Sequence, residues 1–250
     1  MIFFLIYYLH NEFLKSILNS GVKWHNLNFQ AVYNKMTKFQ DHNERRKEMA
    51  YYTYDEFKKF ISYEDDLRWK CVFEILYYCG LRKGELKGLT WKDIYFDKKV
   101  LSVNKLTQRN NRVKFEFSDT KTRDNRRIVP ITKVLLNDLK MFYEQDKKEY
   151  YGFNDDFFVV SDAKPIADSN IYLRRTKLAT LAGLKVIRIH DFRHSCASLL
   201  INNGANVTLV AKYLGHTKIE ETLNTYSHMF STALDSVVSV IDSLEDDTDV

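Results

Sequence analysis

The spacing of apolar residues predicts a chain that is mostly helical. Thr53 and Glu56 are spaced as a capping box, in which a hydroxyl and a carboxylate each bind a free amide at a helix start, so we expect a helix that runs to about Ile61. A second helix is expected over residues 66–79, where apolar residues recur at core spacing. Gly80 follows it, as glycine commonly does where a helix stops in a left-handed turn.

Short segments rich in β-branched and aromatic residues predict a small antiparallel sheet in the middle of the chain, with turns around 97–98 and 119–125. The segments are Val100–Val103, Val113–Phe117 and Arg127–Val129. From about Thr132 the pattern is again mostly helical to the end, apart from an apolar run at 157–160. We therefore expect an α+β fold that is mainly α, a helical body carrying a small antiparallel sheet.

Composition adds that the chain is globular. With 250 residues, 45% of them hydrophobic, it can bury a core and form one large domain with at most a small appendage. The polar run 38–47 is the best candidate boundary. Cys71, Cys79 and Cys196 lack the spacing of a disulfide framework or a metal site, so we expect buried free thiols in a reducing cytoplasm. The apolar start, residues 1–9, is roughly half the length of a spanning helix and lacks signal-peptide features, so no membrane segment is expected.

Net charge points towards a polyanionic partner. The chain carries +5, and its last twenty residues hold six acidic side chains and no Lys or Arg. Without these six negative charges, the rest of the chain carries +11. Such a charge suits nucleic acid but is also common on other soluble proteins.

Candidate chemistry is concentrated in the last third of the chain. His190 and Arg193 lie three apart on a predicted helix and share a face, whereas Asp191 and His194 are expected to point elsewhere. Alone, this pair also fits an ion-pairing helix surface. A further helix is expected to end just before His216, where the macrodipole favours a protonated imidazole.

Three more positions complete the series. Arg82 follows the expected helix stop at Gly80, where the ends of two helices can hold a guanidinium rigidly. Lys121 lies in the second predicted turn of the sheet, and Tyr226 follows His216 by ten residues. The chain has sixteen tyrosines, most of which must serve packing, so only its place in the series makes Tyr226 a candidate nucleophile.

In order and spacing, these positions resemble the active site of the tyrosine recombinase family, which comprises phage and transposon integrases. The likeness spans about Tyr51 to Met229. It is carried by Gly80-Leu81-Arg82-Lys83-Gly84-Glu85-Leu86, Lys121, His190-Asp191-Phe192-Arg193-His194, Leu214-Gly215-His216 and Tyr226.

The resemblance implies an enzyme that moves DNA phosphodiesters onto a tyrosine. Arg82 and Arg193 would hold the scissile phosphate through their forked guanidinium groups and stabilise its transition state. His190 is the family's candidate base for the tyrosine, and His216 would donate to a nonbridging phosphate oxygen. Glu85 either orients a neighbouring guanidinium or is a surface acid.

The chemistry of the departing strand is implied in the same way. Lys121 would give a proton to the 5′ oxygen that leaves, while Tyr226 becomes a 3′-phosphotyrosine. Because that link retains the phosphodiester energy, no nucleotide cofactor is expected, and the arginines take the place of metal ions. The expected partner is double-stranded DNA, in the cytoplasm.

The resemblance also implies a domain organisation. Residues 50–250 would form the catalytic domain with its C-terminal helix or tail. Residues 1–45 would be a remnant of the helical core-binding domain that clamps DNA, truncated relative to the family. The apolar set between Met229 and Leu244 would cap its own domain or dock on a neighbouring subunit, and the family's tetramers on DNA favour docking between subunits.

Two alternatives remain beside a recombinase. A type IB topoisomerase would use the same phosphotyrosine chemistry to relax DNA by rejoining the same strand. A non-catalytic DNA-binding remnant would instead interfere with a full-length recombinase by forming mixed oligomers.

Overall fold

A computed structural model describes residues 13–14, 16–21, 23–25, 49–109, 115–119, 126–216 and 218–226. The chain divides into two compact units, Met1–Glu48 and Met49–Val250. The described residues of the first unit are helical. No helix among the described residues is long and apolar enough to cross a membrane. Lys121, the polar run 38–47 and the apolar set after Met229 lie outside the described residues.

The second unit begins with the two predicted helices, α3 (Tyr54–Ile61) and α4 (Leu67–Tyr78). The capping box is confirmed: the Thr53 amide donates to the Glu56 carboxylate at 2.8 Å, and the Glu56 amide donates to Thr53 Oγ1. Asp66 caps α4 by accepting from two backbone amides. Both helices therefore begin where their local sequence satisfies the free amides.

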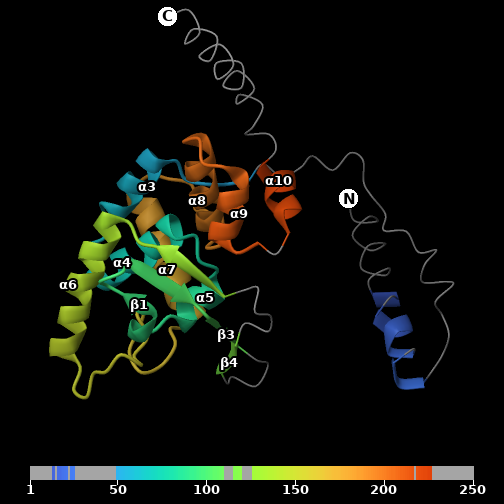
Figure 1. The fold of residues 1–250 in the computed structure, drawn as a ribbon, viewed down its shortest axis with the longest axis horizontal. Helices are drawn as coiled ribbons and strands as arrows, with labels where there is room; N and C mark the ends of the chain where they lie inside the picture. Colours follow the sequence, from blue (N-terminus) through green and yellow to red (C-terminus); the bar gives the residue numbers. More distant parts are fainter. Residues whose placement is uncertain are drawn as a thin grey trace, which may run out of the picture. The chain divides into compact units, whose positions relative to one another are not determined.

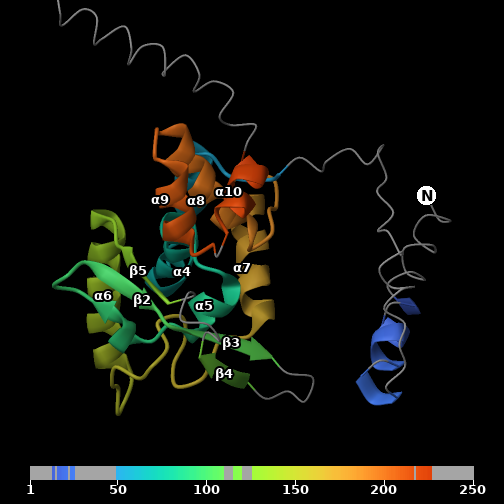
Figure 2. The ribbon, with the colours of Figure 1, turned by 45° about the vertical axis from the view of Figure 1, so that its right-hand side comes forward.

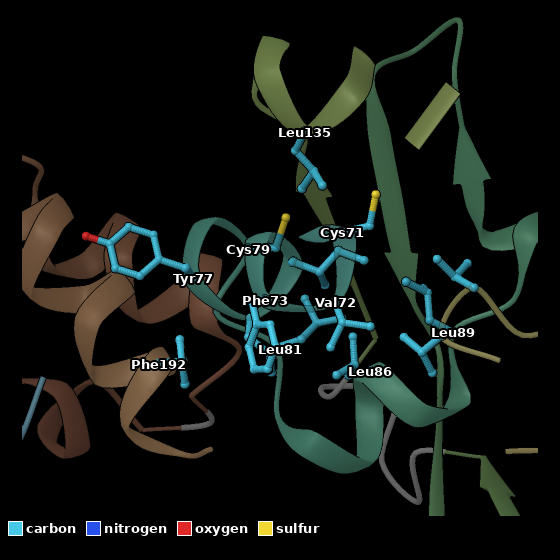
Figure 3. Packing of buried hydrophobic residues seen from close by; sticks show 14 of the residues in the cluster. Cys71, Val72, Phe73, Tyr77, Cys79, Leu81, Leu86, Leu89, Leu135 and Phe192 are labelled. Carbon is cyan, nitrogen blue, oxygen red and sulfur yellow. The ribbon is translucent and has the colours of Figure 1, made fainter. Parts of the chain in front are cut away.

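Helix α4 is the centre of the hydrophobic core. It contacts both α6 (Lys133–Glu149) and α8 (Asp191–Asn202). Figure 3 shows Leu135 of α6 and Phe192 of α8 approaching the α4 side chains from different sides. The Phe192 ring lies 5.6 Å from that of Phe73, centroid to centroid, and both side chains are buried. This packing fixes α8, which carries several candidate site residues, against the middle of the core.

The remaining helices complete a mainly helical body, as predicted. They are α5 (Lys83–Gly88), α7 (Asp168–Leu181), α9 (Val207–Leu214), α10 (Ile219–Tyr226) and the short 3-10 helix η1 (Trp91–Asp93). Helices α8, α9 and α10 gather at one end of the second unit, with α9 in contact with both α8 and α10 (Figure 1, Figure 2). The three buried cysteines are free thiols, as expected.

A three-stranded antiparallel sheet is present, but one of its strands differs from the prediction. The strands are β1 (Ile94–Tyr95), β2 (Val100–Val103), β3 (Lys105–Arg109), β4 (Phe115–Asp119) and β5 (Arg127–Pro130). The sheet has the order β1-β2-β5, with Val103 opposite Arg127, while β3 and β4 form a separate hairpin. The predicted strand at 113–117 thus pairs with β3. Strand β3 was not predicted, because its sequence, Lys-Leu-Thr-Gln-Arg, contains a single apolar residue.

Buried carboxyl groups lie close to the α4 and α6 contact, and two of them, Glu74 and Asp138, interact with each other. Glu74 on α4 is 2% exposed and Asp138 on α6 is 5% exposed. Lys70 Nζ lies 2.9 Å from Asp138 Oδ2. Burial and the negative charge of Asp138 raise the pKa of Glu74 to about 8. The folded protein therefore keeps a proton on Glu74 at a pH at which the unfolded chain releases it.

We expect Glu74→Gln to weaken the pH dependence of stability. Because the folded pKa exceeds the ordinary value of 4.5, the wild-type free energy of unfolding should fall as pH rises from about 5 to 8, by roughly 3 kcal/mol. The variant should lack most of this fall in urea titrations at pH 5.5 and pH 8. Glu144→Gln, on the exposed surface of α6, is the matched control. Equal pH dependence in all three proteins would contradict the assignment.

Candidate functional site

Arg82 stands at the start of α5, immediately after the turn that ends α4. Gly80 has φ +60°, and an added Cβ there would lie 2.6 Å from Leu214 Cδ2, so a glycine is needed for this close approach. The Arg82 guanidinium donates to Glu85 Oε1 at 2.9 Å and to the Gly215 carbonyl at 3.1 Å. The rigid mounting expected for Arg82 is therefore present.

Glu85 is buried and binds two arginines. Arg127 donates from both terminal nitrogens to the two Glu85 carboxylate oxygens, each at 2.9 Å. Burial alone would raise the pKa of Glu85, but its hydrogen bonds and ion pairs with Arg127 and Arg82 lower it to about 2. Of the two interpretations left open by the sequence, the geometry matches a carboxylate that orients guanidinium groups.

Arg127 is a site residue that sequence reasoning missed. Its Nε donates to the Tyr213 carbonyl at 3.0 Å, so it joins β5 both to α5 and to the end of α9. An added Cβ at Gly215, where φ is +73°, would lie 2.9 Å from Arg127 Cδ. The available signal was a basic residue inside an otherwise apolar strand, which does not by itself reveal a partner in another element.

Arg193, on α8, is 2% exposed. Its Nη1 donates to the Gly80 carbonyl at 2.8 Å, and its Nη2 has no hydrogen-bond partner in the part of the chain that the structure describes. Burial and the positive charges of Arg82 and Arg127 lower the pKa of Arg193 to about 9. Arg82 and Arg127 bind the Glu85 carboxylate, and Arg193 adds a third guanidinium close enough to interact electrostatically with all three, so the excess positive charge suits an anion.

His216 follows the left-handed Gly215 that ends α9. Its Nδ1 lies 2.6 Å from Thr222 Oγ1 on α10. Burial and the positive charges of Arg193 and Arg82 lower the pKa of His216 to about 4, so the expected protonated imidazole is wrong. The effect of the helix terminus is outweighed because Arg82 already occupies the Gly215 carbonyl and brings positive charge next to the ring.

Tyr226 is the last residue of α10 and is 1% exposed. Its Oη lies 2.8 Å from His194 Nδ1. The expectation that His194 points away from the site is wrong, because spacing along one helix does not reveal which face a second helix approaches. Burial raises the pKa of Tyr226 above its ordinary value, and the positive charge of Arg193 partly opposes that rise.

His190 is the N-cap of α8 and completes this group. Its ring lies 4.9 Å from that of His194 in a T-shaped arrangement. Loss of water around the ring and the positive charge of Arg193 lower the pKa of His190. Lys121 lies outside the described residues. Lys105, the basic residue that starts β3, instead contacts Asp93 and Thr90 at 2.8 and 2.9 Å.

The structure thus brings five of the six sequence-predicted residues into one site. They come from the start of α5, the start of α8, the turn after α9 and the end of α10. Among the described residues, no group of three or more His, Cys, Asp or Glu side chains has the arrangement of metal ligands. The site combines guanidinium groups and the Glu85 carboxylate with imidazoles of lowered pKa and the Tyr226 hydroxyl.

Comparison with known proteins adds curated relatives. The ICEBs1 integrase of Bacillus subtilis (strain 168) is 30% identical over 209 residues, which cover 80% of this chain and 56% of that protein. A tyrosine recombinase XerC-like protein of Caldanaerobacter subterraneus subsp. tengcongensis is 27% identical over 253 residues, covering 94% of this chain and 65% of that protein. The chain thus spans less than two thirds of the length of either relative.

Solved structures share the fold. The Tn1549 transposon integrase, in complex with a circular intermediate DNA, matches with a TM-score of 0.70 and 21% identity over 92% of this chain and 78% of that one. The XerA recombinase matches with a TM-score of 0.59 and 22% identity, over 76% and 64%. Residues 48–232, most of the second unit, match the sequence profile of the phage integrase family. The chain belongs to the phage integrase family.

Proposed function

We propose that the protein is a site-specific DNA recombinase that cuts and rejoins DNA through a 3′-phosphotyrosine intermediate, in the integration or excision of a mobile element. The observation that carries the proposal is the buried Arg193 guanidinium, whose Nη2 has no hydrogen-bond partner among the described residues, beside Arg82 and Tyr226. A phosphodiester oxygen would supply the missing acceptor. Family membership and the names of the integrase relatives support the same conclusion.

The scissile phosphate would bind between two guanidinium groups. Arg193 and Arg82 would donate to its nonbridging oxygens, and their charge would stabilise the additional negative charge of the transition state. A neutral His216 would also donate an N–H from Nε2, in the tautomer in which its Nδ1 accepts from the Thr222 hydroxyl. His190, at the start of α8, would be the candidate base for the tyrosine that the family resemblance implies.

Tyr226 would attack the phosphorus and displace the 5′ oxygen. The bond from Tyr226 Oη to phosphorus forms as the bond to the 5′ oxygen breaks, and Lys121 would give that oxygen its proton. Attack by a different 5′ hydroxyl would reverse the step and join new strands. The reaction as proposed needs no nucleotide cofactor, because the phosphotyrosine retains the energy of the broken bond.

The proposed partner is double-stranded DNA, bound by a homo-oligomer. Residues 50–250 would act as the catalytic domain, and residues 1–45 would belong to a helical part that clamps DNA. The segment after Met229 would dock on a neighbouring subunit in a tetramer on DNA. These assignments extend the proposed chemistry to the assembly that strand exchange requires.

Covalent trapping tests the proposed function. A nicked suicide substrate, carrying the end of the element that encodes the chain, is incubated with the protein and resolved on a denaturing gel. We expect a protease-sensitive complex whose nucleotide-bearing peptide contains Tyr226 by mass spectrometry. DNA that is bound without any covalent complex would overturn the proposal and favour the interfering remnant. Relaxation of supercoiled plasmids regardless of sequence would favour the topoisomerase.

A further inference from the structure

The Tyr226 hydroxyl has a hydrogen-bonding partner outside the six predicted positions. His194 Nδ1 lies 2.8 Å from Tyr226 Oη, and their ring centroids are 6.0 Å apart. We infer that His194 orients Tyr226 and takes its proton when the tyrosine attacks phosphorus. This would make His194 a further catalytic residue, and the inference rests on the proposed function for the identity of the electrophile.

Geometry favours His194 over His190 as the proton acceptor. A general base must lie within hydrogen-bonding reach of the proton that it removes, about 2.6–3.2 Å between heavy atoms. His194 meets this requirement, and Tyr226 is 1% exposed, so little water competes for the hydroxyl. His190 instead places its ring against that of His194, 4.9 Å between centroids. Among the described contacts, His190 has no hydrogen bond to Tyr226.

The protonation state of His194 suits an acceptor. Burial and electrostatic interactions with His190, Arg188 and Arg193 lower the pKa of His194 to about 4, and Asp191 opposes them. Among the described residues, the charged or titratable groups that act most strongly on His194 are these four, from α8 and the segment before it, and the Tyr226 hydroxyl of α10 contacts it. A neutral imidazole accepts at one nitrogen, which must be Nδ1 if the hydroxyl is to donate to it.

DNA binding would strengthen this base. In the free protein the raised pKa of Tyr226 and the lowered pKa of His194 keep the proton on the tyrosine. A phosphodiester bound to Arg193 and Arg82 brings a negative charge that cancels part of the guanidinium charge next to the imidazole. The pKa of His194 then rises, so the proton acceptor becomes effective when the substrate is in place.

The step balances in atoms and charge. The Tyr226 O–H bond breaks and its proton moves to His194 Nδ1, which gives an imidazolium. The Oη–phosphorus bond forms, and the 5′ oxygen leaves with a proton from the general acid. On rejoining, the imidazolium returns the proton to the tyrosine oxygen as the phosphotyrosine bond breaks.

The test compares His194→Asn with wild type in single-turnover covalent trapping from pH 6 to 9. Asparagine can still accept a hydrogen bond near the Nδ1 position but cannot take the proton. We expect the variant to be about a hundredfold slower at pH 7 and to accelerate about tenfold per pH unit, while wild type is nearly independent of pH. In a substrate with sulfur in place of the 5′ oxygen, the leaving group departs as a thiolate and needs no proton. Such a substrate should not restore the cleavage rate of His194→Asn.

Two results would overturn the inference. One is a His194→Asn rate and pH profile equal to those of wild type. The other is a pH-dependent defect in His190→Asn with none in His194→Asn, which would make His190 the base. A wild-type protein that forms no covalent complex would instead refute the proposed function.

Nitrogen-15 NMR of histidine-labelled protein provides a readout that does not depend on cleavage or on a folded His194 variant. We expect His194 Nδ1 in the free wild-type protein to show the shift of an unprotonated nitrogen that accepts a hydrogen bond, and Tyr226→Phe to move that shift. A proton on Nδ1 would mean that the imidazole donates to Tyr226, and the inference would fail.

Discussion

Tyr226→Phe is expected to form no covalent complex with DNA while binding it as tightly as wild type. The substitution removes one oxygen atom from a side chain that is 1% exposed, so the packing of α10 should be kept. The hydroxyl contacts His194 and takes no part in holding Arg82 or Arg193, so the proposed phosphate-binding residues are untouched. The measurement pairs gel-shift affinity with trapping on the suicide substrate.

Tyr213→Phe is the matched control for this loss. Tyr213 is a partly buried tyrosine of α9, next to the site, and its hydroxyl donates to the Tyr78 carbonyl at 2.9 Å. Removing that hydroxyl should cost about 1 kcal/mol of stability, but the Tyr213 main-chain carbonyl that holds Arg127 remains. Trapping should therefore persist. A covalent complex in Tyr226→Phe, or its loss in Tyr213→Phe alone, would assign the nucleophile elsewhere.

The predictions that succeeded depended on local chemistry. Thr53 and Glu56 satisfy each other's amides within one turn of helix, so the start of α3 could be placed from four residues. Gly80 and Gly215 occupy left-handed turns for the same local reason. The order of the site residues identified the family because the match extends over many positions rather than one motif.

The predictions that failed depended on contacts between distant segments. Arg127 contacts Glu85 and the end of α9 because the fold places β5 next to these segments. The residues adjacent to Arg127 in the sequence do not predict these contacts. His194 was expected to point away from the site. It contacts Tyr226 of α10, and the packing of α10 against this face of α8 cannot be inferred from residue spacing along α8. The charge state of His216 was wrong because burial of the ring and the positive charges of Arg193 and Arg82 outweigh the effect of the helix terminus.

Glu85→Gln is expected to lower the free energy of unfolding by roughly 3 kcal/mol at neutral pH. The carboxylate has a folded pKa of about 2 against an ordinary value of 4.5, so its stabilisation is present above about pH 4.5 and lost as pH falls towards 2. Glutamine keeps the shape but replaces one acceptor oxygen with an N–H₂ group, which then faces a guanidinium donor. Urea titrations between pH 7 and pH 3 should show wild type losing this advantage over the variant.

A comparison of Glu85→Gln with Glu64→Gln should separate the contribution of Glu85 to fold stability from its role in positioning the site residues. Glu64 is another buried carboxylate held by an arginine, since Arg174 Nε donates to it at 2.6 Å, and its hydrogen-bond partners, Arg174 and the Asp66 amide, are not site residues. Both variants should be destabilised, yet at a temperature where both are folded only Glu85→Gln should slow covalent trapping. The reason is that Glu85 fixes Arg82 directly and, through Arg127, the turn that carries His216. Equal trapping rates in the two variants would show that the ion pairs of Glu85 stabilise the fold without orienting the guanidinium groups. The excess positive charge at Arg193 would then suffice to hold the phosphate.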